Sequence, residues 1–336
     1  MKIKQLLMTT IVTTMLVTGC GAQASKNPAE QGNTQATDKQ ETVVINIPTA
    51  ATTGALYPLG SSMANLWTEK LSYIKATAQA SNGGIDNLNL LHTGEAQVSM
   101  AVTSVMYESF NGQGTFEGRP NDKLRVISGL YYNPNQVVVS KDSGINSLKE
   151  IQGKNFASGA PGSTTEVETK LHLQEAGINY PDDLKVQFVG FTEAIDLMRN
   201  KQLDGAWIMA GLPTAAVTEI TTTAGGKLVS IEEDVIAQLQ EKYPWYAKFT
   251  IPAGTYDGQD EDVQTTAIKM AVFTSADLPE DVVYDLTKTF WENIDTLKST
   301  NSALKPMAIE DAISDLAGLP LHDGAIRYYK EIGVLQ

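Results

Sequence analysis

Hydrophobic and polar positions follow two alternating patterns in the first third of the chain. The run at 43–48 is β-branched and ends at a proline, which predicts a short strand. Apolar residues then recur at steps of about 3.6 from Leu59 to Leu71, which predicts an amphipathic helix with Pro58 in its first turn. The same criteria predict a strand at 74–80, a Gly-Gly turn at 83–84, a helix ending at Gly94 and a strand at 97–102.

This order of elements returns in the second half of the chain. Ser163 and Glu166 have the spacing of a capping box, which predicts that a helix begins there. Strands are expected at 154–157, 186–189 and 203–209, and further helices at 192–199, 286–297 and 309–316. Strands that alternate with helices predict an α/β fold with parallel sheets wound by helices, present twice.

Two extended segments that contain proline are expected to join these two units. They are 130–139 and 249–256. We therefore expect one lobe to comprise residues 41–131 plus 257–336 and the other to comprise 132–256. Two lobes joined by two hinge strands favour a hinge motion over rigid docking.

The amino-terminal segment has the composition of a secretory signal. Lys2 and Lys4 precede an uncharged stretch, 5–19, that is shorter than the roughly 20 residues of a membrane-spanning helix. The stretch ends in Leu-Val-Thr-Gly-Cys, which resembles the lipobox of bacterial lipoproteins. We expect residues 1–19 to be a signal peptide, Cys20 to carry lipid and 20–40 to be a flexible linker. The alternative is an ordinary signal with an incidental cysteine.

Composition excludes several classes of function. The 336 residues carry a formal net charge of −14, and no basic patch is present that could hold the phosphates of a nucleic acid. A single cysteine excludes an intramolecular disulfide and a multi-cysteine zinc site. Motifs of hydrolases and nucleotide-binding enzymes are missing from the sequence, and its three histidines have no ligand-like spacing. The acidic run 257–262 favours a solvated loop over a cation site, and no cofactor or metal is expected.

Two loops have the features of an anion-binding site. In both, a strand leads through small residues into the start of a helix, where free backbone N–H groups and the helix dipole attract negative charge. The candidates are Gly54, Ala55, Leu56 and Tyr57 in the first loop, Pro161, Gly162, Ser163, Thr164 and Thr165 in the second, and Gly211 in a third strand-to-helix turn. Ordinary capped turns are the alternative.

Six runs of sequence carry a resemblance to a known family: ATTGALYPLGSSMANLWTEK, KATAQAS, GAPGSTTEVE, GLPTAAVTEI, EKYPWYAKFTIPAGTYDGQDEDV and LPLHDGAIRYYKEIG. They resemble the TAXI-type solute receptors of TRAP transporters from about Val43 to Gly333. The resemblance implies a two-lobed periplasmic-binding-protein fold and delivery to a membrane permease driven by an ion gradient. It also implies a ligand among small carboxylates, such as glutamate, glutamine or a C4–C5 dicarboxylate.

One departure from that family bears on the ligand. Where relatives often have Gln-Ser-Asp, this chain has Val102-Thr103-Ser104. Thr103 and Ser104 are therefore candidate ligand contacts, and the change of two polar groups leaves open which ligand group they contact. None of the arginines lies in the glycine-containing loops, so backbone amides and hydroxyls are expected to recognise the anion.

The sequence therefore predicts a monomeric lipoprotein at the outer face of the cell membrane that binds a small carboxylate and is not an enzyme. One alternative is a binding protein for an ABC-type importer or a membrane sensor kinase. Another is a surface hydrolase that uses Ser163 or Ser104 beside a histidine.

Overall fold

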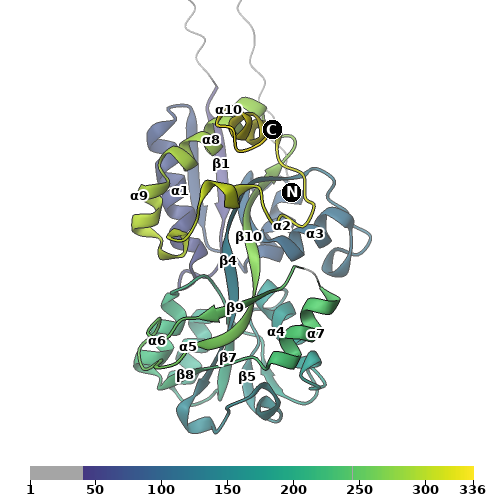
Figure 1. Ribbon diagram of the computed structural model, residues 1–336, viewed down its shortest axis with the longest axis vertical. Helices are drawn as coiled ribbons and strands as arrows, with labels where there is room; N and C mark the ends of the chain where they lie inside the picture. The colour runs from purple at the N-terminus through teal and green to yellow at the C-terminus, as the bar shows by residue number, and fades with distance from the viewer. Residues whose placement is uncertain (1–40, 244) are drawn as a thin grey trace, which may run out of the picture. The chain divides into compact units, whose positions relative to one another are not determined.

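The computed structural model describes residues 41–336 except residue 244. The expected signal peptide at 1–19, the lipidated Cys20 and the linker at 20–40 lie outside the described residues. Figure 1 shows two groups of helices, one above and one below, with strands β4 and β10 running between them. Within the described part of the chain, no helix is both long and apolar enough to cross a bilayer.

The strands confirm most of the expected positions. They are β1 (Val43–Pro48), β2 (Ile74–Gln79), β3 (Val98–Val102), β4 (Leu124–Ser140), β5 (Asn155–Ala157), β6 (Lys185–Gln187), β7 (Gly205–Met209), β8 (Gly226–Val229), β9 (Ala247–Ile251) and β10 (Val263–Ser275). β1 and β2 form a parallel pair. The larger sheet has the order β3-β10-β4-β7-β5-β6, with β8 on β4 and β9 on β10.

The expectation of purely parallel sheets is wrong for the larger sheet. β10 is antiparallel to β3, β4 and β9, and β4 is antiparallel to β7 and β8, whereas β5 is parallel to β6 and β7. The physical reason is the length of β4 and β10. Each is long enough to pair with different strands at its two ends, so the two strands tie both groups of elements into one sheet. The segment 249–256, which was expected to join the lobes, contributes only the end of β9, and β9 pairs with β10. The second long strand that runs between the two groups of elements is β10, which follows this segment in the chain.

The helices also follow the hydrophobic pattern where that pattern was strong. They are α1 (Leu56–Lys70), α2 (Gly84–His92), α3 (Thr103–Asn111), α4 (Thr164–Glu175), α5 (Phe191–Arg199), α6 (Ala215–Thr223), α7 (Glu233–Lys242), α8 (Glu280–Glu292), α9 (Ile294–Thr300) and α10 (Asp323–Glu331). The helix expected at 309–316 is a short 3₁₀ turn at Ile309–Ala312. A helix cannot continue to 316, because Asp315 adopts a positive φ value.

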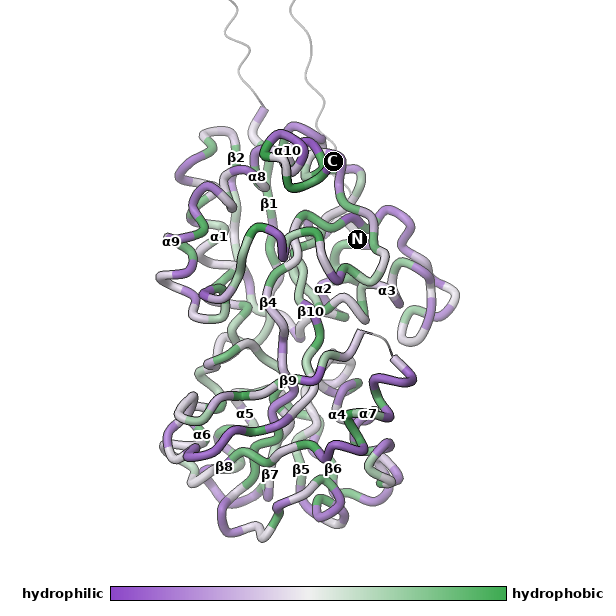
Figure 2. The backbone as a smooth tube through the Cα atoms, in the orientation of Figure 1, coloured by the Kyte–Doolittle hydropathy of each residue, from purple (hydrophilic) through white to green (hydrophobic). Residues whose placement is uncertain are grey.

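Apolar side chains from both groups of elements are removed from water. Figure 2 shows hydrophobic stretches along β7 and β10 and hydrophilic stretches on the outer loops. Trp67 of α1 is fully buried, and its indole N–H donates to the Leu286 carbonyl oxygen at 3.0 Å. Trp207 of β7 is buried in the same way and donates to Asn135 Oδ1 at 2.8 Å. These contacts fix α1 against α8 and β7 against β4, and so hold the strand ends in place.

Candidate functional site

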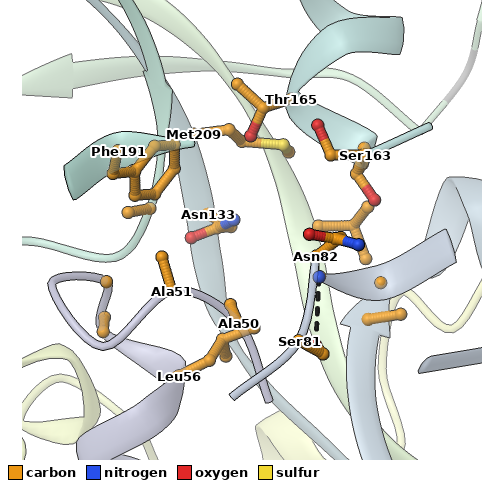
Figure 3. A pocket seen from close by; sticks show the side chains of 18 of the residues that line it. Ala50, Ala51, Leu56, Ser81, Asn82, Asn133, Ser163, Thr165, Phe191 and Met209 are labelled. Carbon is orange, nitrogen blue, oxygen red and sulfur yellow. Dashed lines mark hydrogen bonds between the residues drawn. The ribbon is translucent and has the colours of Figure 1, made fainter. Parts of the chain in front are cut away.

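A cavity of about 110 Å³ lies where the strands of both groups end. Its lining comes from the carboxyl ends of β1, β2, β3, β5, β6 and β7, together with Asn133 of β4 and Met270 of β10. Figure 3 shows Asn133 in the middle, with Phe191, Met209, Thr165 and Ser163 on one side and Ala50, Ala51, Leu56, Ser81 and Asn82 on the other. Ligands bind at this edge of open α/β sheets.

Five of the described helices begin at this cavity. The residue that precedes the first turn of each helix lines it: Ala55 for α1, Gly83 for α2, Val102 for α3, Ser163 for α4 and Gly190 for α5. The first N–H groups of a helix have no partner within the helix, and the helix dipole adds partial positive charge there. The cavity therefore collects hydrogen-bond donors and positive potential from five directions.

Side chains do little to satisfy these donors. Ser163 Oγ accepts a hydrogen bond from the Glu166 N–H at 3.2 Å, and Ser81 Oγ accepts one from the Gly83 N–H at 3.1 Å. The residues that precede α1, α3 and α5 make no side-chain cap hydrogen bond. Acidic residues stand in the first turns of α2, α4 and α5, and those of α2 and α4 accept hydrogen bonds from their own loops. Asp86 accepts from the Asn82 N–H at 3.1 Å, and Glu166 accepts from the Gly162 N–H at 2.6 Å. The positive ends thus remain available to a ligand.

No charged side chain lines the cavity within residues 41–336, residue 244 apart. Most of the wall is alanine, glycine and larger apolar side chains such as Leu56, Phe191 and Met209. The polar side chains are hydroxyls and amides: Ser81, Asn82, Asn133, Ser163, Thr164 and Thr165. Negative charge can therefore be stabilised here only by backbone N–H groups, helix dipoles and neutral donors.

The structure brings together seven of the residues expected to form the site. Gly54, Ala55, Leu56, Ser163, Thr164, Thr165 and Gly211 line the cavity. Tyr57, Pro161 and Gly162 are not among its lining residues, since the last two lie exposed on the outer side of their turn. Thr103 and Ser104 also stay outside the lining, because they begin α3 and only Val102 before them reaches the cavity.

Sequence reasoning missed the residues that come from other segments. Asn133 lies in a strand that was expected only to connect the lobes, and Phe191 begins a helix whose start carries no anion signature. The sequence predicts Gly83 only as part of a turn, whereas in the structure it precedes α2 and lines the cavity. For Gly83 and Phe191, the signal that could have found them is position, because the helix that each of them begins or precedes follows the carboxyl end of a strand.

Contacts beside the cavity hold its two sides together. The Thr53 carbonyl oxygen accepts hydrogen bonds from the Ala216 N–H and from Thr214 Oγ1, both at 3.1 Å. A Cβ added at Gly84 would lie 3.0 Å from Thr164 Oγ1, so α2 and α4 meet closely at their starts. The structure therefore has the arrangement of a closed clamp.

A buried carboxyl group lies one helical turn beyond Thr164. Glu168 of α4 is only 2% exposed, and its Oε2 accepts from Asn135 Nδ2 at 3.1 Å and from the Tyr246 hydroxyl at 2.9 Å. Burial raises the pKa of Glu168 to about 7, and these two hydrogen bonds counteract part of that effect. The carboxyl group therefore keeps its proton to a higher pH than an exposed glutamate does, and its hydrogen-bond partners are neutral donors.

The neighbouring histidine is held neutral. His172 is fully buried, with Nδ1 at 2.7 Å from the Glu168 carbonyl oxygen and Nε2 at 2.7 Å from Thr266 Oγ1. Burial lowers the pKa of His172 to about 4. Since both ring nitrogens are engaged, His172 cannot serve as a base for Ser163. His322 is similarly occupied by the Leu278 carbonyl oxygen and the Gly324 N–H.

The acidic loop at 257–262 has a local structural role. Asp262 Oδ1 accepts from the Ala253 N–H at 2.8 Å. Among the described residues, no group of three or more histidine, cysteine or acidic side chains is placed to hold a metal ion.

Substituting Glu168→Gln should change how stability depends on pH. The folded pKa of about 7 lies above the ordinary value of 4.5, so the folded state holds this proton more tightly than the unfolded state. The resulting stabilisation is complete below about pH 4.5 and is lost as pH rises through 7, a change of about 3 kcal/mol. Urea unfolding at pH 5 and pH 8 should show this loss in the parent and much less of it in Glu168→Gln. An exposed control, Glu193→Gln, should behave as the parent. An equal change of unfolding free energy between pH 5 and pH 8 in all three proteins would contradict a raised pKa at Glu168.

Substituting Thr214→Val should loosen the closed arrangement. It removes one of the two hydrogen bonds to the Thr53 carbonyl oxygen, worth about 1 kcal/mol, and so shifts the ratio of open to closed molecules about fivefold. Small-angle X-ray scattering of the ligand-free protein should register a larger open fraction. Thr222→Val is the matched control, because the Thr222 hydroxyl donates within α6. An open fraction no larger than in this control would contradict a clamping role for Thr214.

The chain is similar to several solved structures at low sequence identity. A structure from Bordetella bronchiseptica RB50 is 16% identical, covers 87% of this chain and 89% of that chain, and has a TM-score of 0.51. The alkanesulfonate-binding protein SsuA from Xanthomonas axonopodis pv. citri, bound to MOPS, is 13% identical over 88% and 96% of the two chains, with a TM-score of 0.47. A structure on glutathione import through GshT and the cystine ABC importer TcyBC of Streptococcus mutans is 14% identical over 85% and 99%, with a TM-score of 0.49.

The expected two-lobed α/β fold of the periplasmic-binding-protein type is confirmed. The narrower expectation of a TAXI-type receptor stays a prediction from the sequence. The model of the NMT1-like family matches residues 47–333, nearly all of the described part, and the chain therefore belongs to the NMT1-like family.

Proposed function

We propose that this protein is an extracytoplasmic solute-binding protein that captures a small organic anion between its lobes and delivers it to a membrane importer. The observation that carries the proposal is the convergence of five helix starts on a cavity without charged side chains. Membership of the NMT1-like family and the two-lobed fold support it.

The ligand we propose is a small organic acid of the glutamate, glutamine or C4–C5 dicarboxylate class. The size of the cavity favours the shorter members. A cavity of about 150 Å³ takes up benzene, which has six heavy atoms, so one of about 110 Å³ is too tight for a C4 diacid, and the lobes must part to admit it. A C5 acid requires the lobes to part further.

The proposed lobes are residues 41–131 plus 257–336 and residues 132–256, with β4 and β10 as the hinge strands. The proposed ligand contacts are the seven lining residues expected from the sequence, together with Asn82, Asn133 and Phe191. A lipid at Cys20, after removal of residues 1–19, would tether the protein to the outer face of the membrane.

For the recipient transporter, an ABC-type importer has somewhat better support from the comparisons than the TRAP-type permease that the sequence resemblance implies. The two differ in their energy source. Uptake of the bound acid by cells should persist after the ion gradient is collapsed if an ABC importer receives it. It should stop at once, with ATP still present, if a TRAP permease does.

A surface hydrolase is the less suitable function for this geometry. A serine nucleophile needs a base within hydrogen-bonding reach, and Ser163 Oγ instead accepts from the Glu166 N–H. Both ring nitrogens of His172 and of His322 are occupied by other groups.

Small acids should raise the melting temperature of the purified protein. A ligand at 100 times its Kd stabilises the folded state by about 2.7 kcal/mol, which corresponds to about 5 °C for a domain of this size. Succinate, malate, glutarate and 2-oxoglutarate should be compared with the uncharged diamide of succinate and with sodium chloride at equal ionic strength. The acids should shift the transition and the diamide should not. A shift with neutral or cationic solutes alone would refute the proposed ligand class.

A further inference from the structure

We infer that the cavity reads a neutral hydrogen-bonding group on its ligand through Asn133 and Thr164, and that it discriminates against a free ammonium group. This inference rests on the proposed function and narrows it. Among small acids, it selects hydroxy acids, or acids that carry an amide, over amino acids. The two residues act as determinants of specificity, separate from the backbone groups that hold the anion.

Asn133 supplies a buried acceptor that no protein group satisfies. Its side chain is 5% exposed, and its Oδ1 has no hydrogen-bond partner among the described residues. Asn135, two residues further along β4, shows the contrast. Its Nδ2 donates to Glu168 Oε2 and to Thr266 Oγ1, and its Oδ1 accepts from Trp207 Nε1. A buried polar atom without a partner costs folding free energy. We therefore expect Asn133 Oδ1, at the centre of the cavity, to accept a hydrogen bond from the ligand (Figure 3).

Thr164 supplies a second unpaired group, from the start of α4. It is the first residue of α4, it is 8% exposed, and its Oγ1 has no partner within the described part of the chain. Thr169, further along α4, again shows the contrast, because its Oγ1 donates to the carbonyl oxygens of Ser158 and Thr165. A hydroxyl group on the ligand could donate to Asn133 Oδ1 and accept from Thr164 Oγ1, so both residues would be satisfied together.

Electrostatics separate a hydroxyl group from an ammonium group here. Both can donate to Asn133, but an ammonium group would lose its hydration in a cavity where no carboxylate of the described residues offers a counter-charge. The five helix starts add positive potential, which repels a cation as it attracts an anion. The buried carboxyl group of Glu168, one turn along α4 from Thr164, is bonded to Asn135 and Tyr246. The cavity therefore disfavours the zwitterion of an amino acid.

Three acids with the same carbon skeleton test this directly. Succinate, malate and aspartate differ at one carbon, which carries hydrogen, hydroxyl or ammonium. Isothermal titration calorimetry at pH 7 should give malate the lowest Kd, about tenfold below that of succinate, and aspartate the highest. The trio of glutarate, 2-hydroxyglutarate and glutamate should repeat the order if the cavity opens for C5 acids. Aspartate binding as tightly as malate would overturn the inference and leave the proposed function standing. If none of the six acids binds, both fall.

Variants assign the effect to the two residues. Asn133→Leu should remove the preference for malate over succinate while succinate still binds. Thr164→Val, which keeps the shape of the side chain, should reduce that preference and checks the result if Asn133→Leu folds poorly. Asn133→Asp should improve aspartate relative to malate, because it adds the missing counter-charge. An unchanged order of the three acids in Asn133→Leu and Thr164→Val would show that these residues do not read the ligand.

Discussion

The convergence of helix starts on one uncharged cavity is the interaction on which the proposed function depends. Ala55, Gly83, Val102, Ser163 and Gly190 each precede a helix and each line the cavity. Only Ser163 uses its side chain to cap its own helix among these described positions. The first N–H groups of a helix have no partner within the helix, and a bound anion would accept hydrogen bonds from them. The same arrangement explains why binding needs no arginine or lysine in the wall.

Two long strands make this convergence possible. β4 and β10 pair with each other over much of their length and reach strands of both lobes, so they fix where the strand ends meet. Close approach across the cavity then depends on small residues. Gly84 has no side chain that would clash with Thr164. The Thr53 carbonyl oxygen accepts a hydrogen bond from the Ala216 N–H at the start of α6. Below Thr164, the Glu168 network ties α4 to β4 through Asn135, so a change in the protonation of Glu168 acts on an element that also lines the site.

The sequence predicts well what is set by local pattern. The strand at 43–48, the helix that contains Leu59 and Leu71, and the helix that follows Ser163 depend on spacing and capping within a few residues. Strand direction is set by tertiary pairing, which explains why the antiparallel course of β10 was not foreseen. For the same reason Asn133 was missed: nothing near it in the sequence shows that its strand passes beneath five helix starts. Pro161 and Gly162 lie exposed outside the cavity lining, and a loop's composition does not tell which of its residues face inward.

A crystal structure of the protein grown with malate tests the central claim most directly. The account predicts electron density for the acid in the cavity, with carboxylate oxygens within hydrogen-bonding distance of first-turn N–H groups from at least one helix of each lobe. Malate bound elsewhere, or held by lysine or arginine side chains while those N–H groups face solvent, would contradict it.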